Sequence, residues 1–157
     1  MSIVLARVDD RLLHGQVATS WVKATDPQVV VVVDDKLPDD PLQTQILKMA
    51  APNGVKVYVM TPEKITEKLK AGVLDAYRVM LIFAGVEAPL KLIEAGVELP
   101  SLNVGGMRFR EGRERISKTI SMTPEEKAIT RRISETGIEI EHRQLHSDGK
   151  IDVMSML

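Results

Sequence analysis

Val29-Val30-Val31-Val32-Val33 is the stretch that decides the fold of this 157-residue chain. Valine is β-branched and favours extended backbone, so the run predicts a strand. No polar residue alternates with the valines, so both faces of that strand are apolar and both must be covered. Such a strand is typical of a parallel sheet that carries helices on each side. The valines therefore predict an interior strand of an α/β sheet.

Other short apolar segments lie on both sides of the valine run and alternate with segments of helical periodicity. A helix is expected from about His14 to Ala24. Further strands are expected at residues 3–8, 55–60, 77–83 and 102–104. This alternation predicts an α/β fold, a single domain over residues 1–157 with a doubly wound, mostly parallel open sheet and helices on both faces.

Three later helices have recognisable starts, because each has an oxygen-bearing residue directly before a proline. These pairs are Asp40-Pro41, Thr61-Pro62 and Thr123-Pro124. Thr123 and Glu126 also have the spacing of a capping box. Glycine commonly follows the last turn of a helix, and Gly72, Gly96 and Gly137 lie where helices are expected to end.

The C-terminal third is expected to be extended and then briefly helical. Residues 138–141 alternate Ile-Glu-Ile-Glu, which predicts a strand with one solvent-facing side. His142 and His146 therefore do not share a helix face, and no metal site is predicted from them. A short terminal helix is expected to pack Ile151, Val153 and Met154 against the sheet.

Two charged segments, 113–115 and 125–127, mix signs at short spacing and predict solvent-exposed faces. The chain as a whole has a net charge of -1 and 44% hydrophobic residues, which fits one globular core. Only 3% of residues are aromatic and no basic run alternates with them, so a nucleic-acid partner is not expected. There is no cysteine, and hence no disulfide or thiolate metal site. No signal peptide or membrane span is seen, so a cytoplasmic location is expected.

The segment from Ala6 to Thr19 carries the candidate site, because an apolar strand pattern there gives way to charge just before a helix. Helix N-termini present free N–H groups and a partial positive charge, and Arg7 and Arg11 add permanent charges, so this junction is a candidate phosphate site. His14 lies at the helix start. Its imidazole can accept a phosphoryl group covalently; the alternative is a capping or surface histidine.

Two aspartates in the same turn have two interpretations. Asp10 is the candidate for orienting the imidazole or Arg11 through a charge-assisted hydrogen bond. The alternative is a turn cap, in which an aspartate accepts hydrogen bonds from nearby backbone N–H groups. Repulsion between carboxylates and an incoming phosphate argues against Asp9 and Asp10 both facing the site.

A pair of adjacent glycines, Gly105-Gly106, follows a predicted strand and should reach the same sheet edge as His14. In doubly wound sheets ligands bind at the carboxyl ends of the strands. The pair either forms a turn with positive φ or lets the backbone approach a phosphoryl group or a partner protein. Arg108 and Arg110 are either phosphate contacts or solvated charges.

Residues 6 to 19, Ala-Arg-Val-Asp-Asp-Arg-Leu-Leu-His-Gly-Gln-Val-Ala-Thr, resemble the active-site signature of a known family. The family is that of the mannose/fructose/sorbose IIB components of phosphotransferase systems, which includes N-acetylgalactosamine systems. Asn103-Val104-Gly105-Gly106-Met107 resembles a second family motif, and the resemblance extends over essentially the whole chain.

This resemblance implies a phosphotransferase that transfers phosphoryl groups from protein Nπ-phosphohistidine to a sugar. His14 matches the histidine that is phosphorylated by a phosphorylated IIA protein or domain. The sugar then receives the group as it enters through the membrane IIC and IID subunits, so a peripheral association with those subunits is expected. Arg11 matches the phosphate-contacting arginine, and transfer through Nδ1 is implied. No cofactor or metal is implied.

The predicted site therefore has catalytic and phosphate-binding members. His14 and Arg11 are the catalytic candidates with Asp10 as orienter, and the phosphate-binding candidates are Arg7, Gly15, Gln16, Gly105 and Gly106. A non-catalytic anion- or metabolite-binding α/β module is the alternative function, although the chain has neither a G-x-G-x-x-G fingerprint nor a Walker lysine motif. The identity of the sugar and the formation of a homo-oligomer are left open.

Overall fold

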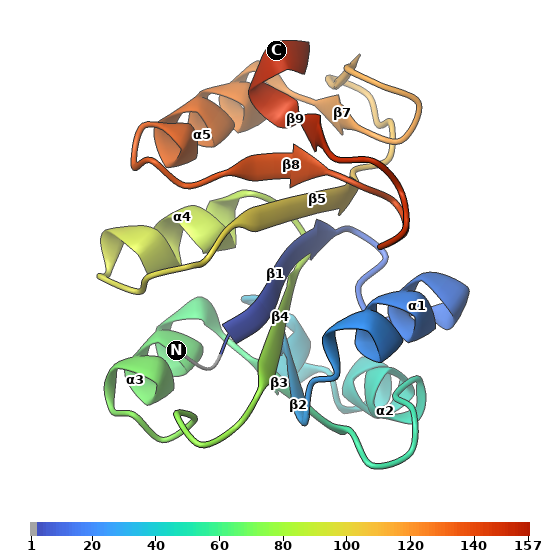
Figure 1. Ribbon diagram of the computed structural model, residues 1–157, viewed down its shortest axis with the longest axis vertical. Helices are drawn as coiled ribbons and strands as arrows, with labels where there is room; N and C mark the ends of the chain where they lie inside the picture. Colours follow the sequence, from blue (N-terminus) through green and yellow to red (C-terminus); the bar gives the residue numbers. More distant parts are fainter. Residues whose placement is uncertain (1–2) are drawn as a thin grey trace.

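A seven-stranded sheet forms the centre of the molecule, in the order β3-β2-β4-β1-β5-β8-β9 (Figure 1). The computed structural model describes residues 3–157, except for the side chains of residues 16–18. Only the β8–β9 pair of this sheet is antiparallel within the described part of the chain. The strands are β1 Ile3–Asp9, β2 Val29–Val33, β3 Lys56–Met60, β4 Val79–Phe83, β5 Leu102–Gly106, β8 Ile140–His142 and β9 Ile151–Asp152.

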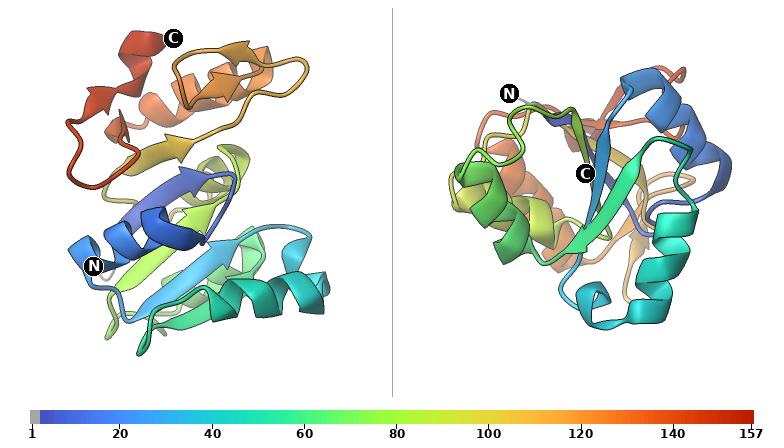
Figure 2. Two further views of the ribbon diagram at one scale, coloured as in Figure 1. Left: turned by 90° about the vertical axis from the view of Figure 1, so that its right-hand side faces the viewer. Right: turned by 90° about the horizontal axis from the view of Figure 1, so that it is seen from below.

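Helices cover both faces of this sheet (Figure 2). One face carries α1 and α2, and the opposite face carries α3, α4 and α5. The helices are α1 Gly15–Thr25, α2 Pro41–Met49, α3 Pro62–Lys70, α4 Glu87–Glu94 and α5 Pro124–Ser134, with short 3-10 turns η1 Leu37–Asp39 and η2 Val153–Met156. None of the helices in the described residues is long and apolar enough to cross a membrane. The predicted doubly wound α/β fold is confirmed.

The five valines divide between two apolar cores, as a strand covered on both sides requires. Val29, Val31 and Val33 lie in the core under α3, α4 and α5, whereas Val30 and Val32 lie in the core under α1 and α2. All five are buried, and β2 lies between β3 and β4. Since successive side chains of a strand point to opposite faces, an uninterrupted apolar run serves both cores.

The predicted helix starts are also confirmed. Asp40, Thr61 and Thr123 are the N-caps of α2, α3 and α5, and each accepts a hydrogen bond from the backbone N–H three residues on. The capping box of Thr123 and Glu126 is complete. Gly72, Gly96 and Gly137 have positive φ just beyond helix ends.

Some expectations for the C-terminal third are wrong, mainly because tertiary partners cover side chains that look solvent-exposed in the sequence, whereas Glu114, Arg115 and Glu125 are exposed as predicted. Arg113 directly precedes a hairpin formed by β6 Glu114–Arg115 and β7 Ser121–Met122. Arg113 there forms a largely buried ion pair with Glu126. Glu141 is buried beside Arg143 rather than on a solvent-facing side. Ile151 belongs to a strand and is exposed, while Val153 is buried in η2.

The connections of the sheet create a crevice between β1 and β5. These strands are neighbours, but the chain leaves β1 toward α1 on one face and leaves β5 through the hairpin toward α5 on the other. Such a point is where open α/β sheets bind ligands. The loop with His14 and the end of β5 with Gly105 and Gly106 therefore meet at one edge, as predicted.

Candidate active site

The loop between β1 and α1 holds His14 at the start of the helix. Leu12 has a φ of 62°, in the left-handed region, so the chain turns sharply before the histidine. His14 is the N-cap of α1, with extended backbone and no capping bond from its side chain. Gly15 follows with a φ of 33°. His14 thus directly precedes the free N–H groups of the first turn, which contains no acidic residue.

Asp9, rather than Asp10, is the carboxylate beside the imidazole. Asp9 Oδ2 lies 3.4 Å from His14 Nε2. Its other oxygen, Oδ1, accepts a hydrogen bond of 3.0 Å from the backbone N–H of Arg11. Asp9 is therefore both the turn cap and the neighbour of the histidine, because it is the last residue of β1 and points into the turn. The assignment of Asp10 as the orienter is corrected on this geometry.

Arg7 supports the Asp9 carboxylate from inside the protein. Its Nη2 donates to Asp9 Oδ2 at 3.1 Å, and its Nη1 donates to Asn103 Oδ1 at 2.6 Å. The backbone carbonyls of Arg143 and Gln144 accept the other two bonds at 3.0 and 3.1 Å. Burial lowers the pKa of the Arg7 guanidinium, and the charge of Asp9 opposes that effect. Arg7 lines the pocket, but protein acceptors already occupy both of its Nη atoms.

A buried polar chain continues from Arg7 across the sheet. Asn103 Nδ2 donates to Glu141 Oε1 at 3.1 Å, and Glu141 accepts two bonds from Arg143, at 2.8 and 3.0 Å. The bond to Glu141 raises the pKa of the Arg143 guanidinium. The charges of Arg7, Asp9, Glu141 and Arg143 sum to zero, so the polar chain of side chains carries no net charge. It links β1, β5 and β8 directly beneath the histidine.

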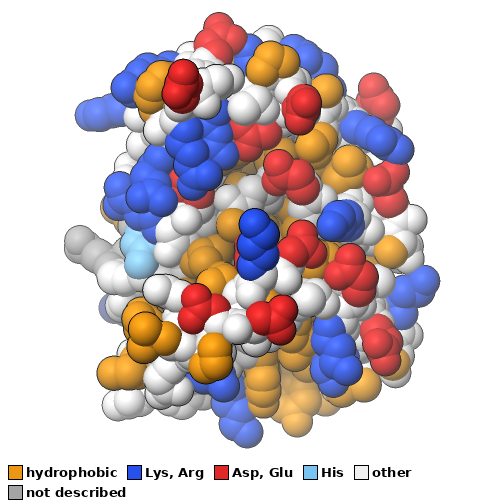
Figure 3. All heavy atoms as spheres, turned by 180° about the vertical axis from the view of Figure 1, so that it is seen from behind, with side chains coloured by type: hydrophobic (Ala, Val, Ile, Leu, Met, Phe, Trp, Pro, Cys, Tyr) orange, Lys and Arg blue, Asp and Glu red, His pale blue; other side chains and the backbone are white. Residues whose placement is uncertain are grey.

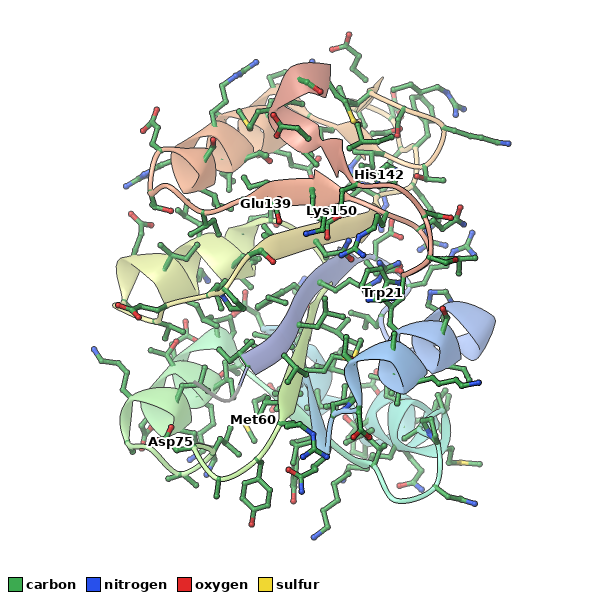
Figure 4. All side chains as sticks on the ribbon, in the orientation of Figure 1. Trp21, Met60, Asp75, Glu139, His142 and Lys150 are labelled. Atoms are coloured by element: carbon green, nitrogen blue, oxygen red, sulfur yellow. The ribbon has the colours of Figure 1, made fainter. Side chains whose placement is uncertain are left out.

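Trp21 of α1 lies against both ends of this chain, facing the segment that follows β8 (Figure 4). The guanidinium carbons of Arg7 and Arg143 each lie 4.9 Å from the centre of its ring, a distance at which cations attract the ring. Its Nε1 donates to the carbonyl of Gln144 at 2.9 Å. The segment around Gln144 is therefore held against α1 at the edge of the site.

Gly105 is a glycine because Arg7 occupies the space of a side chain. A Cβ at position 105 would lie 2.0 Å from Arg7 Nη2, and position 105 has no positive φ. Gly106 also lacks a positive φ, and its carbonyl accepts from the backbone N–H of Asp10 at 3.1 Å. The interpretation of the pair as a turn with positive φ is therefore wrong. The first one makes room for a guanidinium inside the protein.

Asp10 is covered by arginines from the segment after β5. Its Oδ2 accepts from the backbone N–H of Arg108 at 2.8 Å and lies 3.3 Å from Arg108 Nε. Arg110 and Arg113 approach the same oxygen at 3.8 and 3.9 Å. Both aspartates line the pocket, because Arg7 and these arginines compensate their charges. Arg108 and Arg110 thus both contact Asp10 while their side chains stay more than half exposed, and Arg108 also lines the pocket.

These residues surround a pocket of about 200 Å³ in which cations outnumber carboxylates. Seen from behind, Lys and Arg side chains gather along one edge of the molecule next to a histidine (Figure 3). The lining residues are Arg7, Asp9, Asp10, Arg11, His14, Gly105, Gly106, Met107, Arg108, Phe109, Arg115, Lys118, Thr119, Ser121 and Gln144. Within residues 3–157, no group of three or more metal-ligating side chains is found. The pocket has the space and the positive charge to accept an anion such as a phosphoryl group.

Six of the eight predicted site residues line the same pocket. Arg7, Asp10, Arg11, His14, Gly105 and Gly106 all line the pocket. Arg11 is exposed there, and its only hydrogen bond among the described residues is made by its backbone N–H. Gly15 begins α1 next to the pocket. The side chain of Gln16 lies outside the described residues.

Sequence reasoning missed the wall formed by the β6–β7 hairpin and by Gln144. Arg115, Lys118, Thr119 and Ser121 come from that hairpin. The hairpin has only two residues in each strand, which is too short for a periodic signal. The Ser-Lys-Thr sequence at residues 117–119 is compatible with a loop, but no local signal indicates that this loop lies near His14.

Comparisons with known proteins identify the family to which this sequence and fold belong. The family model described as "PTS system sorbose subfamily IIB component" matches residues 3–157. The fructose-specific EIIB component of Bacillus subtilis (strain 168) is 35% identical over 157 residues, covering 100% of this chain and 96% of that protein. The mannose-specific EIIAB component of Escherichia coli (strain K12) is 36% identical, and this chain spans only 49% of its length.

A solved structure gives the same result at the level of the fold. The IIBSor domain of the sorbose permease from Klebsiella pneumoniae superposes with a TM-score of 0.96 at 31% identity, covering 99% of this chain and 96% of that one. The chain therefore belongs to the sorbose subfamily of phosphotransferase-system IIB components, a family of phosphotransferases with a role in sugar phosphotransfer.

Proposed function

We propose that this protein carries a phosphoryl group on His14, received from the phosphohistidine of a IIA protein or domain. The group then passes to a sugar held by the membrane IIC and IID subunits. The observation that supports this proposal best is the position of His14, at a helix N-terminus in a cation-rich pocket with a carboxylate beside Nε2.

Asp9 favours one tautomer of the His14 imidazole. A carboxylate only accepts hydrogen bonds, so an Asp9 partner favours the proton on Nε2 and leaves the lone pair on Nδ1. Nδ1 is then the nucleophile. As the new N–P bond forms, the N–P bond on the donor breaks and its electron pair returns to the donor imidazole. The phosphorylated ring of His14 is cationic while Nε2 keeps its proton, and Asp9 stabilises that charge.

The pocket supplies the electrostatic stabilisation that phosphoryl transfer needs. Charge spreads over the three equatorial oxygens of the transferred group, so positioned cations and N–H groups can stabilise it. Arg11 is exposed at the pocket and offers a planar fork of donors, and the first turn of α1 offers backbone N–H groups. In the second step the N–P bond breaks and its electron pair returns to Nδ1 of His14, a P–O bond to the sugar forms, and the sugar hydroxyl releases its proton to solvent.

Labelling by a phosphorylated IIA protein tests this proposal. The protein should gain one acid-labile, alkali-stable phosphoryl group, located on His14 by mass spectrometry. His14→Ala should fold normally, because the side chain is only partly buried, yet accept no phosphate. His146→Ala is the matched control and should be labelled like the parent. Undiminished labelling of His14→Ala would overturn the proposal, as would anion binding with no covalent label, the behaviour of a non-catalytic module.

A further inference from the structure

Arg108, in the segment after β5, lines the same pocket as His14 but has no role in the proposed function. Its Nε lies 3.3 Å from Asp10 Oδ2, and its side chain is 56% exposed. Within the described part of the chain, its Nη1 and Nη2 make no hydrogen bond. These two atoms form a planar fork of N–H donors, which matches two oxygens of a phosphoryl group. Arg108 therefore presents a pair of available donors at the pocket.

The backbone of Arg108 is fixed on both sides. Its N–H donates to Asp10 Oδ2 at 2.8 Å, and its carbonyl accepts from Arg113 Nη1 at 2.7 Å. Arg113 is in turn held by Glu126 through bonds of 2.9 and 2.8 Å. A side chain on a fixed backbone loses less conformational freedom when it binds a ligand. The donors of Arg108 are therefore largely preorganised.

Asp10 connects Arg108 to the turn that carries His14. Asp10 directly follows Asp9, the carboxylate beside the imidazole, and its side chain is buried. Its backbone N–H donates to the carbonyl of Gly106 at 3.1 Å, so the turn and the end of β5 are joined directly. The contacts with Asp10 thus hold Arg108 against the same turn as His14.

The charges that line the pocket favour an anion. Arg7 pairs with Asp9, so the other cations of the lining face a single carboxylate, that of Asp10. Two nearby glutamates have their own partners, since Glu126 pairs with Arg113 and Glu114 with Lys127, and the exposed Glu111 does not line the pocket. The cations that remain in excess over Asp10 are Arg11, Arg108, Arg115 and Lys118.

The other cations after β5 are placed differently from Arg108. Arg110 approaches Asp10 at 3.8 Å but does not line the pocket. The guanidinium carbon of Arg115 lies 4.6 Å from the centre of the Phe109 ring, so that group is held over an aromatic face. Lys118 is exposed and carries its charge on one nitrogen, without a planar fork. Arg108 combines a place in the pocket, a fixed backbone and a fork of donors.

We propose that Arg108 is a second arginine ligand of the phosphoryl group on His14. The inference rests on the proposed function and deepens it. Arg11 binds the group from the turn between β1 and α1, and Arg108 binds it from the segment after β5. The Nη atoms of Arg108 donate to phosphoryl oxygens, and no covalent bond changes in this contact. Arg108 thereby stabilises the negative charge of the group during transfer and in the phosphorylated protein.

Phosphorus NMR of the phosphorylated protein, separated from the IIA protein, tests this contact directly. A nearby cation favours the doubly charged phosphoryl group, so Arg108→Ala should raise the pKa of that group by about one unit. Arg110→Ala is the matched control, because it removes the same charge from a side chain that also contacts Asp10 and is 60% exposed. It should titrate like the parent. Equal phosphoryl pKa values in Arg108→Ala and the parent overturn the inference.

Single-turnover transfer gives a second readout that a structural role would not move. Arg108→Ala should keep the circular dichroism spectrum of the parent, because its backbone bonds to Asp10 and Arg113 do not need the side chain. At saturating phosphorylated IIA protein its labelling rate should fall by about tenfold or more, the effect of a charge-assisted hydrogen bond. Arg108→Lys should recover part of this rate, and Arg110→Ala should match the parent.

The same kinetics separate phosphoryl binding from recognition of the IIA protein. If Arg108 only bound the IIA protein, Arg108→Ala would need more of that protein for half-saturation but would reach the limiting rate of the parent. That result overturns the inference. A parent protein that accepts no phosphate on His14 refutes the proposed function itself.

Discussion

Arg7 and Arg11 lie four residues apart and have opposite environments. Arg7 is 2% exposed, and both of its Nη atoms donate to protein acceptors. Arg11 is exposed at the pocket. The Arg7 side chain extends from β1 into the protein interior. Arg11 lies in the turn after Asp9, and its side chain extends toward solvent. Arg7 therefore holds Asp9 in place, whereas the exposed guanidinium of Arg11 is the one in this motif that can bind a phosphoryl group.

Arg11→Lys should slow phosphoryl transfer to His14 markedly while leaving stability nearly unchanged. Lysine keeps the positive charge but loses the planar pair of donors that matches phosphate oxygens. The exposed side chain contributes little packing, so the free energy of unfolding should stay within about 0.5 kcal/mol of the parent. Rapid-quench labelling by phosphorylated IIA and urea unfolding measure the two quantities. Equal transfer rates in variant and parent would refute the role of Arg11.

Gly105→Ala should destabilise the protein, because the new methyl group would meet the Arg7 guanidinium. Arg7 cannot give way without breaking its bonds to Asp9 and Asn103, so a loss of about 1–3 kcal/mol is expected from overpacking. Gly149→Ala is the matched control, since nothing lies within 4 Å of a Cβ there. Urea unfolding should separate the two variants. Equal stability in both would show that Arg7 has room to move.

At the scale of elements, α5 holds the β6–β7 hairpin that forms one wall of the pocket. Arg113 donates to both carboxylate oxygens of Glu126, at 2.9 and 2.8 Å, and both side chains are largely buried. Glu126 also closes the capping box of α5. One carboxylate thus fixes the start of a helix and the position of the hairpin that carries Lys118 and Thr119.

Glu126→Gln should therefore lower stability by roughly 2 kcal/mol, because it weakens hydrogen bonds between charged groups that are out of water. It should also increase amide hydrogen exchange in residues 113–121. Glu125→Gln, which changes an exposed neighbour on the same helix, should stay within about 0.5 kcal/mol of the parent. Urea unfolding and exchange measured by mass spectrometry provide the check. Unchanged hairpin exchange in Glu126→Gln would count against this anchoring role.

At the scale of the whole molecule, the polar chain from Asp9 to Arg143 links three strands and the C-terminal segment beneath His14. Glu141 has the central position, since it accepts from Asn103 and from Arg143. Glu141→Gln should cost about 3 kcal/mol, because it leaves the guanidinium of Arg143 without its counter-charge in a partly buried place. The single tryptophan, Trp21, lies against Arg143 and reports the change through its fluorescence.

Glu139→Gln is the matched control for this variant. Glu139 lies next to Lys150 (Figure 4) and pairs with it at 3.1 Å, and both side chains are about half exposed. Such pairs contribute at most about 1 kcal/mol, so this variant should unfold like the parent and keep its tryptophan spectrum. Denaturant titrations followed by Trp21 emission compare the two. If Glu139→Gln proved as destabilising as Glu141→Gln, burial of the polar chain would not be the cause.

Much of the architecture follows from local sequence alone. The valine run, the three cap-proline pairs and the glycines after helices each act through backbone preference or burial over a few residues, so their outcome does not depend on distant parts of the chain. The same holds for His14 at the start of α1. Strand order then brings Gly105 to the same edge, because parallel strands place their carboxyl ends together.

The roles of the charged side chains were decided only by the tertiary structure. Asp9 and Asp10 are neighbours in sequence, but the segment after β5 provides arginines for Asp10, while Arg7 and His14 lie beside Asp9. Glu126 and Glu141 look like solvated charges until Arg113 and Arg143 cover them. A charge is stable inside a protein only with a partner, and these partners come from other elements or from the way a loop folds back. Local pattern therefore determined the fold and the place of the histidine, whereas long-range electrostatic pairing determined what surrounds it.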